Sequence, residues 1–179
     1  MAAIGKVAKR YAKSLLDLAL EQKLEEKINT DMLMLQSLCD SNRDFTAFLT
    51  SPIIQSRKKL KVFDAIFQGN IEKMSLEFMK LLIKNKREGM LEEISLGYIE
   101  QLKKQKGILD VFVESVQPLE DNTIKLITEK IKKHFEGTIE IYESTNPELL
   151  GGFVVMVEDK QIDASIKTQL ANLKNILLN

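Results

Sequence analysis

The sequence predicts a mainly α protein, with an N-terminal six-helix bundle at residues 1–106 and a small C-terminal α+β domain at residues 107–179. Two patterns support this prediction. In the first part, apolar residues recur at spacings of three and four, as they do on one face of a helix. After Gly107, apolar and polar residues alternate, as they do in a strand with one buried face. The change of period places a domain boundary near Lys106-Gly107.

Six helical segments, separated by short polar breaks, are predicted in the first domain. They cover residues 3–22, 25–40, 44–49, 57–67, 75–87 and 90–105. Pro52 accounts for one break, because the residue before a proline avoids the α region. Ser56 and Ser75 are the candidate N-caps of the fourth and fifth helices, and Gly69 and Gly89 are their candidate terminators.

The second domain is predicted to contain four strands and two helices. In the stretch ILDVFVESV (108–116), Leu109, Val111 and Val113 face one way and the residues between them face the other. Pro118 ends this strand. The later elements are a helix near 120–135, strands at 138–144, 151–157 and 160–163, and a closing helix at 165–178.

Charge and composition limit the possible partners. The 26 Lys and Arg residues balance the 26 Asp and Glu residues, whereas a nucleic-acid-binding protein usually carries a basic excess. Nucleic acid is therefore not an expected partner. No apolar run approaches the ~18 residues of a membrane span, so direct membrane insertion is not expected. Cys39 is the only cysteine, which excludes a disulfide within the chain and fits a reducing compartment.

Histidine and cysteine, which often carry catalysis or bind metals, occur once each. His134, the only histidine, lies on the apolar side of the predicted helix near 120–135 and has no second histidine or cysteine at metal-ligand spacing. A packing or surface role is the preferred interpretation, and Cys39 is similarly interpreted as a small buried hydrophobe. The basic clusters at 57–61, 84–87 and 103–106 are interpreted as solvated faces and helix ends. No cofactor or metal site is predicted.

Gly151-Gly152 allows two interpretations, a phosphate-binding loop or the start of a hairpin. A phosphate loop aims free backbone N–H groups at the anion and usually continues with a lysine and a hydroxyl residue. Here the glycines lead into FVVMV, which favours a strand, and no lysine or hydroxyl residue follows at the required places. We therefore interpret the pair as glycines that let the chain turn, or let another backbone approach, where a strand begins.

Two predicted helices have more apolar surface than one core requires. A helix on a single core needs an apolar stripe of a little over ~100°. Apolar residues cover roughly 180° of the helix at 3–22 and roughly 200° of the helix at 75–87. Either both helices are buried on two sides, or they contribute to an exposed apolar groove that receives a partner helix. The pattern alone leaves both interpretations open.

Four stretches carry a resemblance to a known family. They are RYAKSLLDLALEQ, SPIIQSRKKLKVFDAIF, NKREGMLEEISLGYIEQLKKQKGILDVFVESVQPL and PELLGGFVVMVEDKQIDASIKTQLANLKNIL. Together they span nearly the whole chain, and it resembles the delta subunit of bacterial F-type ATP synthases, whose mitochondrial relative is the oligomycin-sensitivity-conferring protein. The last stretch is the most specific, and in that family its two glycines, Gly151 and Gly152, belong to a structural hairpin.

The resemblance implies a non-catalytic stator connector, on the cytoplasmic side of the plasma membrane as a peripheral part of the synthase. Its N-terminal domain would bind the N-terminal helix of an alpha subunit in a groove between the first and fifth helices. Its C-terminal domain would hold the C-terminal ends of the peripheral-stalk b subunits. Ser14 stands where an alanine is common in the family. The groove residues expected in this chain are Tyr11, Ala12, Leu15, Leu76, Met79 and Ile83.

Two other hypotheses remain at this point. One is an unrelated helical adaptor that binds an amphipathic helix of another partner. The other is an enzyme with a phosphate site at Gly151-Gly152.

Overall fold

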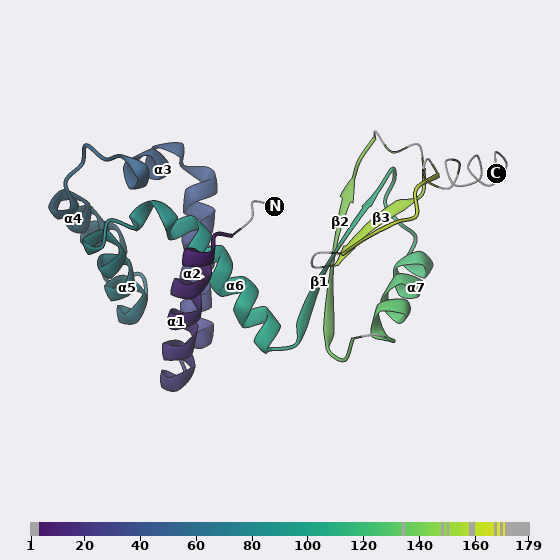
Figure 1. Ribbon diagram of the computed structural model, residues 1–179, viewed down its shortest axis with the longest axis horizontal. Helices are drawn as coiled ribbons and strands as arrows, with labels where there is room; N and C mark the ends of the chain where they lie inside the picture. The colour runs from purple at the N-terminus through teal and green to yellow at the C-terminus, as the bar shows by residue number, and fades with distance from the viewer. Residues whose placement is uncertain are drawn as a thin grey trace. The chain divides into compact units, whose positions relative to one another are not determined.

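The computed structural model describes residues 4–133, 135–147, 149, 151–157, 160–166, 168 and 170 of the 179-residue chain (Figure 1). The chain forms two compact units, Met1–Lys103 and Lys104–Asn179. The first unit is built from helices, and the second combines a helix with a four-stranded sheet. The protein is therefore mostly helical with a small sheet. Among the described residues, no helix has both the length and the apolar character needed to cross a bilayer.

Helices of the first unit follow the predicted order. They are α1 (Lys6–Gln22), α2 (Glu25–Ser41), α3 (Arg43–Thr50), α4 (Ser56–Phe67), α5 (Lys73–Lys84), the 3-10 helix η1 (Glu88–Met90) and α6 (Leu91–Gln105). α1 ends where Lys23 takes a left-handed conformation with φ of 57°. This allows the N–H of Leu24 to donate to the carbonyl of Ala19 at 2.9 Å, which satisfies a terminal carbonyl of the helix.

The start of α5 differs from the prediction. Ser75, the expected N-cap, lies inside the helix. The Asp31 carboxylate of α2 instead accepts hydrogen bonds from the backbone N–H of Glu72, at 3.0 Å, and from the Ser75 hydroxyl. A side chain 41 residues earlier in the chain therefore caps the first turn of α5. Ser56 also differs from the prediction, because it is the first residue of α4 and not its cap.

The end of α5 also differs from the prediction. The helix stops at Lys84 and does not extend to Gly89. Lys86 takes φ of 57°, so the N–H of Arg87 donates to the carbonyl of Leu82 at 2.8 Å. The left-handed residue is therefore a lysine, where the sequence pattern points to a glycine.

One apolar core joins the helices of the first unit. Phe45 of α3 packs against Phe63 and Phe67 of α4, with ring centroids 6.2 and 6.3 Å away. An ion pair of 2.7 Å between Lys80 and Asp64 links α5 to α4 at the surface. The remaining core residues come from α1, α2, α3, α5 and α6, among them Ala8, Leu16, Ala19, Ile28, Met32, Leu35, Leu49, Leu82, Leu91, Ile94, Tyr98 and Leu102.

We expect residues 1–106 to fold without the rest of the chain, because this segment contains the whole first core. Circular dichroism of the fragment should show strong helicity and one cooperative thermal transition. A shallow, non-cooperative melt would contradict independent folding of the helical unit.

The second unit is a four-stranded sheet with one described helix, α7 (Figure 1). The strand order is β2-β1-β3-β4; β1 and β2 are parallel, and β3 is antiparallel to β1 and β4. The predicted closing helix at 165–178 lies largely outside the described residues. The elements are β1 (Ile108–Ser115), α7 (Asp121–Lys132), β2 (Thr138–Thr145), β3 (Phe153–Val157) and β4 (Lys160–Asp163).

The alternation in β1 decides which face of the sheet α7 covers. Leu109, Val111 and Val113 are buried, and they form one cluster with Ile127 of α7 and Val155 of β3. The residues between them point to the opposite face, because side chains alternate along a strand. One face of the sheet is thus packed against α7.

Candidate protein-binding site

The residues expected to line a groove are mostly part of the core. Ala12, Leu15, Met79 and Ile83 are each at most 1% exposed, and Leu76 is 8% exposed. Tyr11 is the exception, since it is partly exposed at the edge of the core. In the free chain, five of the six expected groove residues are therefore buried, and only Tyr11 reaches the surface.

Ala12 shows why a small residue on this helix is buried. A Cβ atom added to Gly97 of α6 would lie only 3.2 Å from the Cβ of Ala12. The small side chains of these two residues therefore allow α1 and α6 to approach closely. Two hydrogen bonds support the same contact: Glu93 accepts from the N–H of Gly5 at 3.1 Å, and Gln101 donates to the carbonyl of Lys9 at 3.1 Å.

The apolar residues of α1 that the core does not bury lie along one solvent-facing edge of the helix. Val7 is 40% exposed and Leu18 is 48% exposed, and Tyr11 lies between them in the sequence. With Ser14, these residues follow spacings of four, three and four, so they form one line along the helix. The polar hydroxyl of Ser14 interrupts an otherwise apolar line.

A matching line runs along α5. Leu81 is 48% exposed, and Phe78 and Met74 are partly exposed at spacings of three and four. The rings of Tyr11 and Phe78 meet edge to face, with centroids 6.5 Å apart and an interplanar angle of 67°. This contact joins the two lines into one surface, here called the α1–α5 strip, which consists of Val7, Tyr11, Ser14, Leu18, Met74, Phe78 and Leu81.

The first turn of α5 is tied to α2. Asp31 is buried, and burial raises the pKa of its carboxyl above the ordinary value, while the hydrogen bonds from Ser75 and Glu72 lower it. Lys27 of α2 adds an ion pair of 2.8 Å with Glu72. α5, which carries half of the strip, is thus held to α2 by a buried carboxylate.

Gly151 and Gly152 lie at the beginning of β3, opposite the end of β4. Gly152 has φ of 79°, and a Cβ atom there would lie 2.4 Å from the carbonyl oxygen of Ala164. The carbonyl of Gly151 accepts a hydrogen bond of 3.0 Å from the N–H of Ile166. Close approach of the backbone therefore requires glycine here. The turn between β3 and β4 lies outside the described residues.

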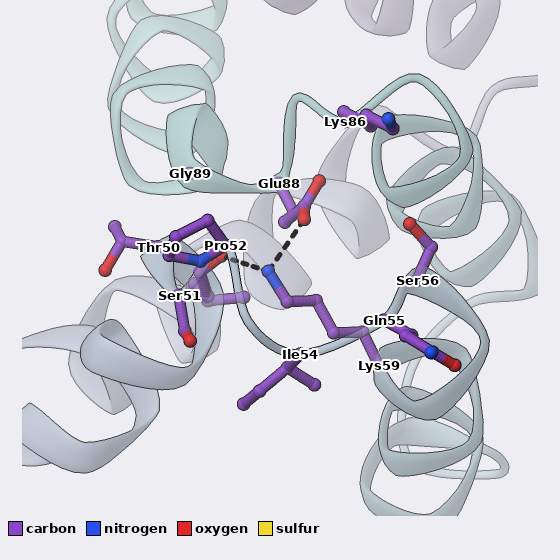
Figure 2. A pocket seen from close by; sticks show the side chains of 11 residues that line it. Thr50, Ser51, Pro52, Ile54, Gln55, Ser56, Lys59, Lys86, Glu88 and Gly89 are labelled. Carbon is purple, nitrogen blue, oxygen red and sulfur yellow. Dashed lines mark hydrogen bonds and ion pairs between the residues drawn. The ribbon is translucent and has the colours of Figure 1, made fainter.

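A pocket of about 670 Å³ lies beside the loop between α3 and α4 (Figure 2). Lys59 of α4 is 1% exposed there, and its ammonium donates to the carbonyl of Leu49 and to Oε1 of Glu88, both at 2.7 Å. Reading all of 57–61 as a solvated face is therefore wrong for Lys59. Its position four residues before buried Phe63 and eight before buried Phe67 is the sequence signal for this burial.

Cys39 does not form a reactive site in the described structure. Burial raises the pKa of the Cys39 thiol to about 11, so the thiolate that would act as a nucleophile is disfavoured at neutral pH. His134 lies outside the described residues. Within the described part of the chain, no group of three or more His, Cys, Asp or Glu residues could hold a metal ion.

The second unit also presents apolar side chains on the sheet face that α7 does not cover. Phe112 of β1 stacks on Tyr142 of β2 with ring centroids 5.2 Å apart, and both are paired across the strands. Met156 of β3 lies opposite Phe112 and is 46% exposed. The three side chains form a cross-strand row in which Tyr142 and Met156 are exposed and Phe112 is partly exposed.

The fold is that of a two-unit protein that carries exposed apolar side chains on α1 and α5 and on one face of its sheet. Residues 7–177 match the family described as ATP synthase delta (OSCP) subunit, and the chain belongs to that family.

Relatives of similar length support this assignment. The ATP synthase subunit delta of Cytophaga hutchinsonii is 34% identical over 174 residues, covering 95% of this chain and 93% of the relative. The subunit of the same name from Parabacteroides distasonis is 33% identical, with 98% and 97% covered. A chain in the Toxoplasma gondii mitochondrial ATP synthase hexamer has the same fold, with a TM-score of 0.74 at 21% identity and 98% of this chain covered.

Proposed function

We propose that this chain is the stator connector of an F-type ATP synthase, which links the catalytic head to the peripheral stalk. The observation that carries the proposal is the family match over residues 7–177, which includes both compact units. The chain is a non-catalytic subunit: it makes and breaks no bond. By holding the head against the drag of the rotating shaft, it lets proton-driven torque produce ATP.

In this proposal α1 to α6 act as one six-helix bundle that binds the head. The α1–α5 strip receives the apolar face of the N-terminal helix of an alpha subunit, with Tyr11 and Phe78 at its centre. Tyr11 is a suitable anchor residue for the partner helix, because its side chain is large and stiff and carries a hydroxyl that can reach the rim of the strip. The buried residues Ala12, Leu15 and Met79 support the strip from beneath.

The second unit would hold the C-terminal ends of the b subunits. The partly exposed cross-strand row of Phe112, Tyr142 and Met156 supports a protein partner for this unit, because such a row is typical of a surface that another chain covers. The complete subunit would then lie on the cytoplasmic side of the plasma membrane, peripheral to it, and would use neither nucleic acid nor direct membrane insertion.

Charged substitutions in the strip should weaken binding of the head without unfolding the protein. We expect Tyr11→Asp to cost at least ~2 kcal/mol of binding to a peptide of the alpha subunit's N-terminal helix, as is typical for loss of an interface anchor. Leu18→Asp should act in the same direction. Fluorescence anisotropy with a labelled peptide gives the affinity, and a thermal melt gives the stability.

Leu33→Asp is the matched control, because Leu33 of α2 is 49% exposed and Leu18 is 48% exposed. Equal losses of affinity for Leu18→Asp and Leu33→Asp, or an unchanged affinity for Tyr11→Asp, would contradict a binding site on the strip.

A further inference from the structure

The strongest unassigned feature is the pocket between the loop after α3 and the segment after α5. It brings together parts of the chain that are about 30 residues apart, and its lining includes Leu49, Pro52, Ile54, Lys59, Lys86 and Glu88 (Figure 2). None of these residues belongs to the α1–α5 strip. A function for this pocket is thus independent of the binding site proposed above.

The charge of the two segments that form the pocket is strongly one-sided. Residues 51–61 and 84–89 contain a single carboxylate, Glu88, and it is paired with Lys59. Six further cations in these segments are exposed, in a chain whose net charge is zero. None of the six forms an ion pair with a described carboxylate. They are Arg57, Lys58, Lys61, Lys84, Lys86 and Arg87.

An apolar side chain lies beside these charges. Ile53 is 89% exposed, more than any other large hydrophobic side chain in the described residues. It stands in the loop next to Pro52 and Ile54, which line the pocket. A partner for this surface therefore needs acidic groups and one apolar contact.

The polar groups inside the pocket favour a peptide over a phosphate. The Lys59 ammonium has three N–H donors, and the hydrogen bonds to Leu49 and Glu88 use two of them. Oε2 of Glu88 is buried and has no hydrogen-bond partner among the described atoms. Because the Lys59 ammonium and the Glu88 carboxylate are largely buried and paired with each other, the described interior of the pocket offers a phosphate no free cation, whereas the side chains of a peptide can reach the exposed cations at its rim. The lining contains no aromatic side chain on which a nucleic-acid base could stack.

We propose that this pocket is a second docking site, which binds an acidic segment of a protein partner. Acidic side chains of the segment lie among Arg57, Lys58 and Lys86, and an apolar side chain packs on Ile53, while the buried Lys59–Glu88 pair holds the two lining segments together. The exposed cations attract the segment electrostatically, so binding weakens as the salt concentration rises.

The test uses the full chain and two synthetic peptides, EDLIEDE and its uncharged counterpart QNLIQNQ. We expect EDLIEDE to bind and QNLIQNQ to bind at least ~tenfold more weakly, because only the first can pair with the cations. Arg57→Glu/Lys58→Glu should weaken EDLIEDE binding at least ~tenfold. Ile53→Ser should weaken it severalfold while the melting temperature stays unchanged, since this side chain is almost fully exposed.

Two controls make the result specific. Lys125→Glu/Lys130→Glu changes the net charge equally on exposed positions of α7 and should leave binding within ~twofold. Tyr11→Asp should leave the binding of EDLIEDE unchanged, so failure of this proposal can be told from failure of the α1–α5 strip.

No binding of EDLIEDE, or equal effects of the two charge reversals, would overturn the proposal. Binding to phosphatidylglycerol vesicles that depends on Arg57 and Lys58 and that EDLIEDE does not displace would also overturn it, by assigning the surface to a membrane.

Discussion

Lys59→Met should lower the free energy of unfolding of the helical unit by about 3–5 kcal/mol. This is the range found when one partner of a buried ion pair is removed and the other charge stays buried. The substitution removes the only described partner of the Glu88 carboxylate, which is largely buried. It also removes the hydrogen bond that Lys59 donates to the carbonyl of Leu49. Chemical denaturation followed by circular dichroism at 222 nm measures the change, because that wavelength reports helix content.

Two variants separate loss of the pair from loss of a lysine. Lys58→Met, at the exposed neighbouring position, should change the stability by less than about 0.5 kcal/mol. The double variant Lys59→Met/Glu88→Leu should recover much of the loss, because no buried charge is left without a partner. If Lys59→Met were as stable as the unsubstituted chain, Lys59 would not be buried beside Glu88.

Gly152→Val should destabilise the sheet unit by about 3 kcal/mol or more, because a left-handed backbone and a steric clash act together. At Gly152 a β-branched side chain would have to adopt φ near 79°, and its Cβ would lie 2.4 Å from the carbonyl oxygen of Ala164. Hydrogen exchange of the β1 amides of Val111 and Val113 reports opening of this unit directly. Binding to the C-terminal ends of the b subunits should weaken in parallel.

Gly107→Val is the matched control within the same unit. Gly107 also has a positive φ, of 65°, but nothing lies within 4 Å of an added Cβ. Its substitution should therefore cost only the conformational strain, about 1–2 kcal/mol. Equal effects at the two positions would argue against the close backbone approach at Gly152. A rise in melting temperature with ATP or phosphate would instead favour a nucleotide site at the glycines.

The sequence by itself determined the order and type of the secondary structure. The helical period of residues 1–106 and the alternation after Gly107 are local properties, and the described α-helices and strands follow the predicted order, although both ends of α5 are displaced and the 3-10 helix η1 was not predicted. The width of the apolar arcs on α1 and α5 also correctly indicated that these helices carry apolar residues beyond one core face. Such patterns can be recognised without tertiary information, because the geometry of a helix or strand fixes the directions of neighbouring side chains.

Only the tertiary structure decided which half of each apolar arc is buried. Periodicity places Tyr11 and Ala12 on the same apolar side of α1, but contact with Gly97 of α6 buries Ala12 and leaves Tyr11 partly exposed. The same limit applies to polar residues. Ser75 bonds to Asp31, 44 residues away, and Lys59 pairs with Glu88, 29 residues away. A helical pattern records spacing within one element, whereas burial and pairing depend on residues that another element brings near.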